Sequence, residues 1–170
     1  MRNIQMVDLQ GQYQKIKSEI DAAIFDVINS AKFIKGPQVE TFAKNLAAYT
    51  GAKHVIPCAN GTDALQMAMM ALELKPGDEV ITATFTYAAT AEVIALLGLV
   101  PVLVEVNPNT FCIDPTSIEA AITSKTKAIV PVNLFGQCCE MEKIKAIAAK
   151  HNLYVIEDKD KAIGEVYKFL

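Results

Sequence analysis

The chain of 170 residues has no apolar run approaching the roughly 20 residues that are needed to span a bilayer. Its most apolar region, from Ala88 to Leu103, is interrupted by Glu92 and Pro101. The first eight residues lack the basic head and apolar core of a secretion signal. We therefore expect a cytoplasmic protein with no membrane partner.

Charge of one sign and metal-ligating side chains are scarce as well. The net charge is −3 and is spread along the sequence, so there is no basic stripe for nucleic acid. The four cysteines (Cys58, Cys112, Cys138, Cys139) show no C-x-x-C spacing, and there are only two histidines. We expect buried reduced thiols and no metal site, since the case for zinc is weak. With 52% hydrophobic residues, the chain can bury a real core.

Two amphipathic helices are predicted ahead of the first strand. Residues 13–29 place their apolar side chains on one helical face, and a second helix follows Gly36-Pro37 and continues to Tyr49. This is unusual for a doubly wound domain. We expect a helical N-terminal arm over residues 1–50 and an α/β sheet over residues 51–170, with no linker between them.

Short apolar strands alternate with helices in the remainder of the chain. The predicted strands are Val55-Ile56, Glu79–Ala83, Pro101–Val106, Lys127–Val132 and Leu153–Ile156. The predicted helices cover residues 62–74, a segment reaching Leu97, a segment starting at Asp114-Pro115, and residues 140–150. This pattern predicts an α/β fold with a mainly parallel sheet and helices on both faces.

Ligands of such sheets bind at the carboxyl ends of the strands, where four loops carry polar side chains. These loops are Asn60–Asp63, Thr84–Tyr87, Asn133–Gly136 and Glu157-Asp158. In the first, Gly61 and the amides of the helix start would suit a phosphate, although Thr62 or Asp63 acting as a helix cap also explains the pattern. Ordinary alternatives exist for the others: Tyr87 in the core, Asn133 as a loop cap, and Asp158 as a helix cap or magnesium ligand.

Two common nucleotide-binding motifs are absent from the sequence. There is no G-x-x-x-x-G-K-[ST], which a P-loop requires, and no G-x-G-x-x-G, which a nicotinamide dinucleotide site requires. A flat phosphorylated cofactor of another kind therefore fits the four loops best.

Several segments along the whole chain follow the order and spacing of one known family: Pro57-Cys-Ala-Asn-Gly-Thr-Asp-Ala-Leu65, Pro76-Gly-Asp-Glu-Val80, Phe85-Thr-Tyr-Ala-Ala-Thr-Ala91, Leu97-Gly98 with Pro101-Val102, Ala121-Ile-Thr-Ser-Lys-Thr-Lys-Ala-Ile129, Pro131-Val-Asn-Leu-Phe-Gly-Gln137 and Val155-Ile-Glu-Asp158. Together they resemble the DegT/DnrJ/StrS-type nucleotide-sugar aminotransferases. That resemblance implies the large domain of the aspartate-aminotransferase fold (PLP fold type I). Within the family, the first and sixth segments are similar to enzymes that aminate a 3-keto UDP-N-acetylglucosaminuronic acid.

The resemblance also implies a cofactor, pyridoxal 5'-phosphate (PLP), and a site formed by Gly61, Thr62, Asp63, Tyr87, Asn133, Asp158 and Lys161. The phosphate would bind the backbone around Thr62 and Asp63, Tyr87 would lie against the ring, and Asp158 would pair with the pyridine nitrogen. The implied partners are a nucleotide-sugar and an amino donor, usually glutamate, in the synthesis of cell-surface polysaccharide or antibiotic sugars. The loop Phe33–Pro37 resembles a segment near the sugar-nucleotide site that is often shared across a homodimer.

Two departures from the family pattern stand out. The family has Glu-Asp-Ala-Ala followed by Gln or His, whereas this chain has Glu157-Asp-Lys-Asp-Lys161. The lysine that forms the Schiff base in the family lies beyond this aspartate, and the sequence stops at Leu170. We therefore expect a truncated large domain without its C-terminal small domain, inactive alone, that associates with itself or with a complementing C-terminal half.

Three alternatives remain open at this point. The chain is a non-catalytic remnant that binds a phosphorylated ligand or a partner chain, or Lys161 replaces the missing Schiff-base lysine, or the parent enzyme is a PLP-dependent sugar dehydratase. Covalent chemistry tolerates little misplacement of the reacting group, which counts against Lys161.

Overall fold

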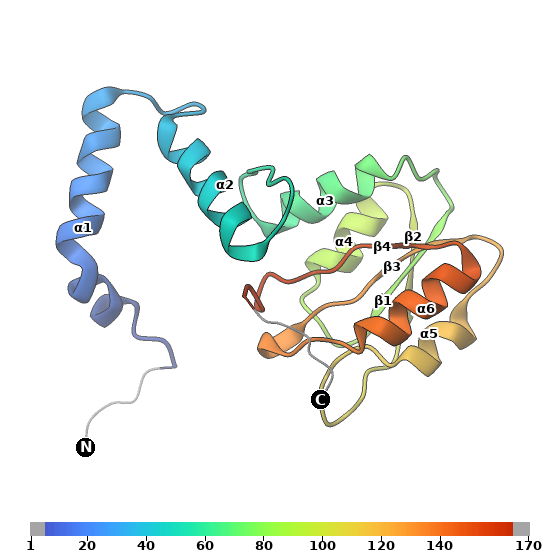
Figure 1. The fold of residues 1–170 in the computed structure, drawn as a ribbon. Coiled ribbons are helices and arrows are strands. Elements are labelled where there is room, and N and C mark those ends of the chain that lie inside the picture. Colours follow the sequence, from blue (N-terminus) through green and yellow to red (C-terminus); the bar gives the residue numbers. More distant parts are fainter. Residues whose placement is uncertain (1–5, 165–170) are drawn as a thin grey trace, which may run out of the picture. The chain divides into compact units, whose positions relative to one another are not determined.

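The structure is a computed structural model that describes residues 6–164, and the chain divides between Pro57 and Cys58 into two compact units. The first unit contains α1 (Leu9–Ser30) and α2 (Pro37–Thr50), which confirms the two predicted helices (Figure 1). Asp8 caps α1 by accepting a hydrogen bond from the Gly11 amide at 2.8 Å. Neither helix contains a buried residue, so their apolar faces are exposed. No helix within residues 6–164 combines the length and apolar content needed to cross a membrane.

The second unit is built on a sheet whose strands run parallel, as predicted; it has four strands in the order β2-β1-β3-β4. The strands are β1 (Glu79–Ala83), β2 (Val100–Val104), β3 (Thr126–Val130) and β4 (Tyr154–Val155). The helices are α3 (Gly61–Ala71), α4 (Ala89–Leu96), α5 (Pro115–Ala121) and α6 (Met141–His151). In the register of the sheet, Ile81 of β1 pairs with Val102 of β2 and with Ile129 of β3.

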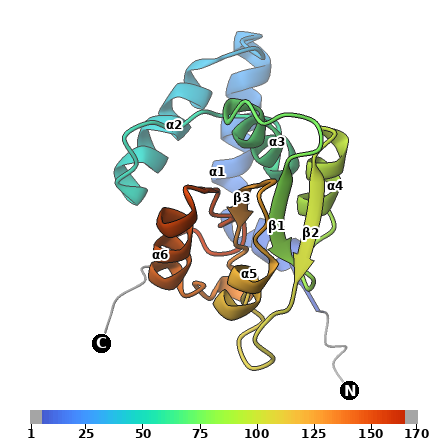
Figure 2. The same ribbon diagram turned by 90° about the vertical axis from the view of Figure 1, so that its right-hand side faces the viewer.

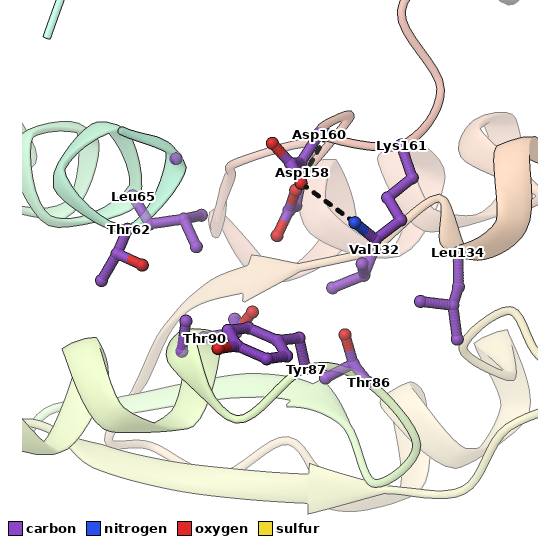
Figure 3. Close-up of a pocket in the computed structure, with 12 residues that line it drawn as sticks. Thr62, Leu65, Thr86, Tyr87, Thr90, Val132, Leu134, Asp158, Asp160 and Lys161 are labelled. Atoms are coloured by element: carbon purple, nitrogen blue, oxygen red, sulfur yellow. Dashed lines mark hydrogen bonds and ion pairs between the residues drawn. The ribbon is translucent and has the colours of Figure 1, made fainter. Parts of the chain in front are cut away.

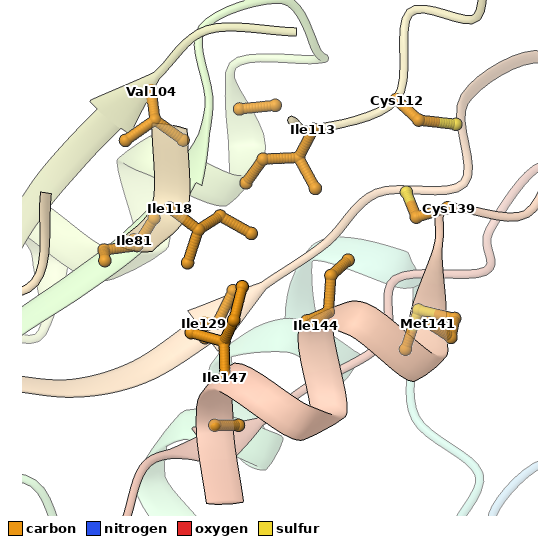
Figure 4. Packing of buried hydrophobic residues seen from close by; sticks show 12 residues of the cluster. Ile81, Val104, Cys112, Ile113, Ile118, Ile129, Cys139, Met141, Ile144 and Ile147 are labelled. Carbon is orange, nitrogen blue, oxygen red and sulfur yellow. The ribbon is translucent and has the colours of Figure 1, made fainter. Parts of the chain in front are cut away.

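Alternate residues of the central strands enter two separate hydrophobic clusters. Figure 2 shows the ribbons of α5 and α6 on one face of the sheet and those of α3 and α4 on the other. Ile81 and Ile129 pack with α5 and α6 through residues such as Ile118 and Ile144, as Figure 4 shows. The neighbouring positions Val80, Ala128 and Val130 point to the other face, where Met69 of α3 and Val93 and Ile94 of α4 cover them. The helices therefore cover both faces, as the uniformly apolar strands predict.

The predicted strand at Val55-Ile56 is wrong. These residues lie in a loop, and the side chain of Ile56 is 74% exposed. Two apolar residues make a strand only where a neighbouring strand offers hydrogen bonds, and the following Pro57 has no amide hydrogen to donate. The helix after this loop also starts earlier than predicted, at Gly61.

The prediction for the cysteines is half right. Cys112 and Cys139 are buried beside the cluster of α5 and α6, and burial raises the pKa of the Cys139 thiol, so it stays protonated. Cys58, however, is exposed, and Cys138 is only partly buried.

Candidate functional site

A cavity of about 210 Å³ lies at the carboxyl ends of the strands (Figure 3). The order of the sheet reverses between β1 and β3, because the chain goes from β1 to β2 on one side and from β3 to β4 on the other. Ligands of open α/β sheets bind at this kind of reversal. The cavity is lined by Gly61, Thr62, Leu65, Thr86, Tyr87, Ala89, Thr90, Val132, Leu134, Asp158, Asp160 and Lys161.

The N-terminus of α3 forms one wall of the cavity. Asn60, rather than Thr62 or Asp63, caps the helix: its Oδ1 accepts from the Asp63 amide at 2.9 Å, and its carbonyl accepts from the Ala64 amide at 3.1 Å. Among the residues that the structure describes, this leaves the amides of Gly61 and Thr62 without an acceptor. An anion beside them would meet two free donors and the positive end of the helix dipole.

Asp158 forms the opposite wall and is fixed by the backbone. Its amide donates to the Pro131 carbonyl and its carbonyl accepts from the Asn133 amide, both at 2.9 Å, which extends the pairing of β3 and β4 past the ends of the strands. Burial raises the pKa of the Asp158 carboxyl, and the charge of Asp160 raises it further, whereas the hydrogen bond from the Asp160 amide and the charge of Lys161 lower it. A cationic group in the cavity would relieve this cost of burial.

Two neighbouring side chains from the loop after β1 form the floor. Thr86 Oγ1 is buried and has no hydrogen-bond partner within the described part of the chain. A buried polar atom without a partner is rare in proteins, and here it lines a cavity that a polar ligand would fill. The ring of Tyr87 is 76% exposed beside it, so the alternative that Tyr87 belongs to the core is excluded.

Asn133 and Asp63 contact the protein instead of lining the cavity. The buried Asn133 side chain donates to Glu157 Oε1 at 2.9 Å and accepts from the Cys139 amide at 2.9 Å. The carboxylate of Asp63 accepts from Asn60 Nδ2 at 3.2 Å. For both residues, direct contact with a cofactor stays a prediction, while the observed contacts hold the loops that carry Asp158 and Thr62.

Lys161 does lie at the cavity, and its Nζ is 3.5 Å from Asp160 Oδ2.

Sequence reasoning missed Thr86, Thr90, Leu134 and Asp160 as lining residues. Thr86 and Leu134 lie in two of the loops that the sequence predicts at the binding site, but the polarity of a loop does not show which of its side chains face the cavity. No group of three or more His, Cys, Asp or Glu side chains suited to a metal ion occurs among residues 6–164.

Comparison with known proteins gives this geometry a context. Residues 14–168 match the DegT/DnrJ/EryC1/StrS aminotransferase family. The chain belongs to this family. A Pseudomonas aeruginosa relative, UDP-2-acetamido-2-deoxy-3-oxo-D-glucuronate aminotransferase, is 52% identical over 165 residues, which are 97% of this chain and 46% of the relative.

Solved structures of family members have the same fold. S. venezuelae DesV, in complex with a ketimine intermediate, matches with a TM-score of 0.93 and 36% identity over 96% of this chain and 44% of its own. NtdA of Bacillus subtilis, with bound cofactor PMP, matches with a TM-score of 0.88 and 40% identity over 96% of this chain and 38% of its own. The chain thus has the α/β architecture of PLP-dependent DegT-type aminotransferases and spans less than half the length of each of these three relatives.

Proposed function

We propose that the chain supplies the PLP-binding wall of a nucleotide-sugar aminotransferase. The observation that carries the proposal is the convergence, on one cavity, of the two free amides of α3, the half-buried carboxyl of Asp158 and the unpartnered hydroxyl of Thr86. These groups match a flat ring that carries a phosphate and a protonated nitrogen. When bound, PLP supplies an electron sink for amino transfer.

Each side chain then has a defined task toward the cofactor. The amides of Gly61 and Thr62 bind the phosphate, Tyr87 packs on one face of the ring, and Thr86 Oγ1 donates a hydrogen bond to a polar ring substituent. Asp158 holds a proton at the pyridine nitrogen, and because its carboxylate is partly desolvated it gains more from that cation than an exposed carboxylate would.

The proposed substrate is a keto nucleotide-sugar, with glutamate as amino donor, in the synthesis of a surface polysaccharide or an antibiotic sugar. The name of the Pseudomonas relative supports a 3-keto UDP-sugar. A cavity of about 210 Å³ is below the roughly 300–1,000 Å³ of typical ligand pockets, so the nucleotide must lie outside it. We propose that this reaction requires residues beyond the matched part of the relatives and that this chain alone is inactive.

Cofactor binding is tested by titrating the purified chain with PLP and following the absorbance of the bound cofactor. Wild type should bind saturably, and Asp158→Asn should weaken binding roughly tenfold or more, the value of a charge-assisted hydrogen bond. Glu142→Gln removes a carboxylate from an exposed position of α6 and serves as the charge-matched control. Equal affinity of wild type and Asp158→Asn would reject the role of Asp158, and no saturable binding would reject the proposal.

Borohydride reduction of the same mixture, followed by peptide mass mapping, tests the alternative in which Lys161 is the covalent anchor. A single stoichiometric adduct on Lys161 that disappears in Lys161→Ala would support it. Scattered labelling of exposed lysines would reject Lys161 as the anchor and leave the non-covalent site as the explanation of binding.

A further inference from the structure

The Asp160 carboxylate lies at the start of α3, where the proposed function places a phosphate. Its Oδ1 is 3.1 Å and its Cγ 3.6 Å from the position that a Cβ on Gly61 would take. Asp160 lines the same cavity as Gly61 and Thr62, and in Figure 3 it lies beside Asp158. The chain's own carboxylate therefore approaches the positive end of the helix.

Local contacts hold the main chain of Asp160 in this place. Its amide donates to Asp158 Oδ1 at 3.2 Å, and the Ala162 amide closes the following turn by donating to the Lys159 carbonyl at 2.9 Å. The ion pair with Lys161 joins two side chains that are more than 60% exposed, so it adds little. The turn after Asp158 thus directs the side chain of Asp160 toward α3.

From these contacts we propose that the carboxylate of Asp160, which lies close to the free amides at the N-terminus of α3 without accepting from them, repels the phosphate of the cofactor and thereby lowers the affinity of the site for it. This inference rests on the proposed function. The other carboxylates nearby, Asp63 and Asp158, are engaged by Asn60 and by the Asp160 amide, while Lys161 is the cation that partly offsets Asp160. A phosphate on the free amides would meet Asp160 as a like charge a few ångströms away.

The experiment compares PLP with pyridoxal, which has the same ring and no phosphate. Asp160→Asn keeps the shape of the side chain and removes its charge, and we expect it to tighten PLP binding about tenfold while leaving pyridoxal binding unchanged. The gain should shrink as salt is raised, because Asp160 is exposed. Glu142→Gln, with the same loss of charge on α6, should change neither affinity.

The outcomes separate this inference from the proposed function. If wild type binds PLP and Asp160→Asn binds it equally well, Asp160 does not oppose the phosphate, and the proposed function stands. A tightening of equal size for pyridoxal and PLP would also overturn the inference, because the effect would then not act through the phosphate. If neither variant binds PLP saturably, both ideas fail. Thermal unfolding followed by circular dichroism shows that each variant is folded.

Discussion

At the scale of single residues, Asp158 combines a structural cost with a proposed task. Burial raises the pKa of its carboxyl, so the folded chain binds this proton more tightly than the unfolded chain does. The contribution of Asp158 to stability is then fully present below the ordinary carboxyl pKa and is lost as the pH rises through the raised pKa. The charged Asp158 carboxylate that the cofactor would need at neutral pH therefore lowers the stability of the cofactor-free chain.

Asp158→Asn should accordingly stabilise the cofactor-free chain at pH 7, because it removes a carboxylate that is costly to bury. The gain should fade as the pH falls below about 4, where the wild-type carboxyl is protonated in both states. Urea unfolding at pH 7 and at pH 3.5 measures both differences. A larger gain at the lower pH would contradict this sign.

At Gly61, a single substitution should affect the stability of the fold and the affinity for PLP differently. A methyl group here would lie 3.1 Å from Asp160 Oδ1, an exposed side chain that can move aside. Gly61→Ala should leave stability unchanged or raise it by up to about 1 kcal/mol, because alanine favours the helix. It should weaken PLP binding about tenfold, because the methyl group enters the space of the phosphate.

Ala64→Gly is the matched control for this substitution, since Ala64 is exposed on the same helix and does not line the cavity. It should lower stability by roughly 0.5–1 kcal/mol and leave PLP affinity unchanged. Urea unfolding and PLP titration measure the two effects. A Gly61→Ala chain that binds PLP as well as wild type would remove Gly61 from the site.

At the scale of elements, the cap of α3 is a small contact on which the cavity depends. Asn60→Ala should cost about 1 kcal/mol of stability, because the Asp63 amide loses its acceptor. Asn60→Asp should retain most of the stability, since aspartate caps as well as asparagine does. Urea unfolding of the three chains provides the comparison, and an equal loss in both variants would show that Asn60 stabilises the fold in another way.

The periodic elements were predictable from the sequence, and the contacts between them were not. The β1 and β3 strands and helices α5 and α6 follow from apolar runs and from the cap Asp114 before Pro115, which the structure confirms. The Val55-Ile56 strand failed because strand formation depends on a neighbour that local sequence does not reveal.

The site divides in the same way. Its four loops were predicted, because the carboxyl ends of parallel strands meet at one edge. Which side chains face the cavity depends on loop conformation, so Thr86 was missed, and Asn133, selected as a ligand contact, is engaged by Glu157 and Cys139. Asp160 was visible only as a departure from the family pattern.

At the scale of the whole molecule, the two compact units bury very different amounts of themselves. In the sheet unit, every described helix and strand except β4 contributes a buried hydrophobic residue, and Val155 of β4 packs against the buried cluster. The helices α1 and α2, by contrast, contain no buried residue. An isolated helix of 14 residues such as α2 is marginal in water, and most of the stability of helices in proteins comes from tertiary packing of their apolar face. Their exposed apolar residues, including Ile16, Ile24 and Phe42, are consistent with our expectation that the chain associates with another chain.

Hydrogen exchange measured by mass spectrometry should therefore separate the units. In dilute solution, peptides from α1 and α2 should exchange much faster than peptides from β1 and β3, because opening these helices exposes no core. If a second copy covers the helices, their protection should rise with protein concentration while that of β1 and β3 stays constant. This expectation would be contradicted if α1 and α2 were as well protected from exchange as the central strands at every protein concentration. Such protection would have to come from packing within the single chain that buries the two helices.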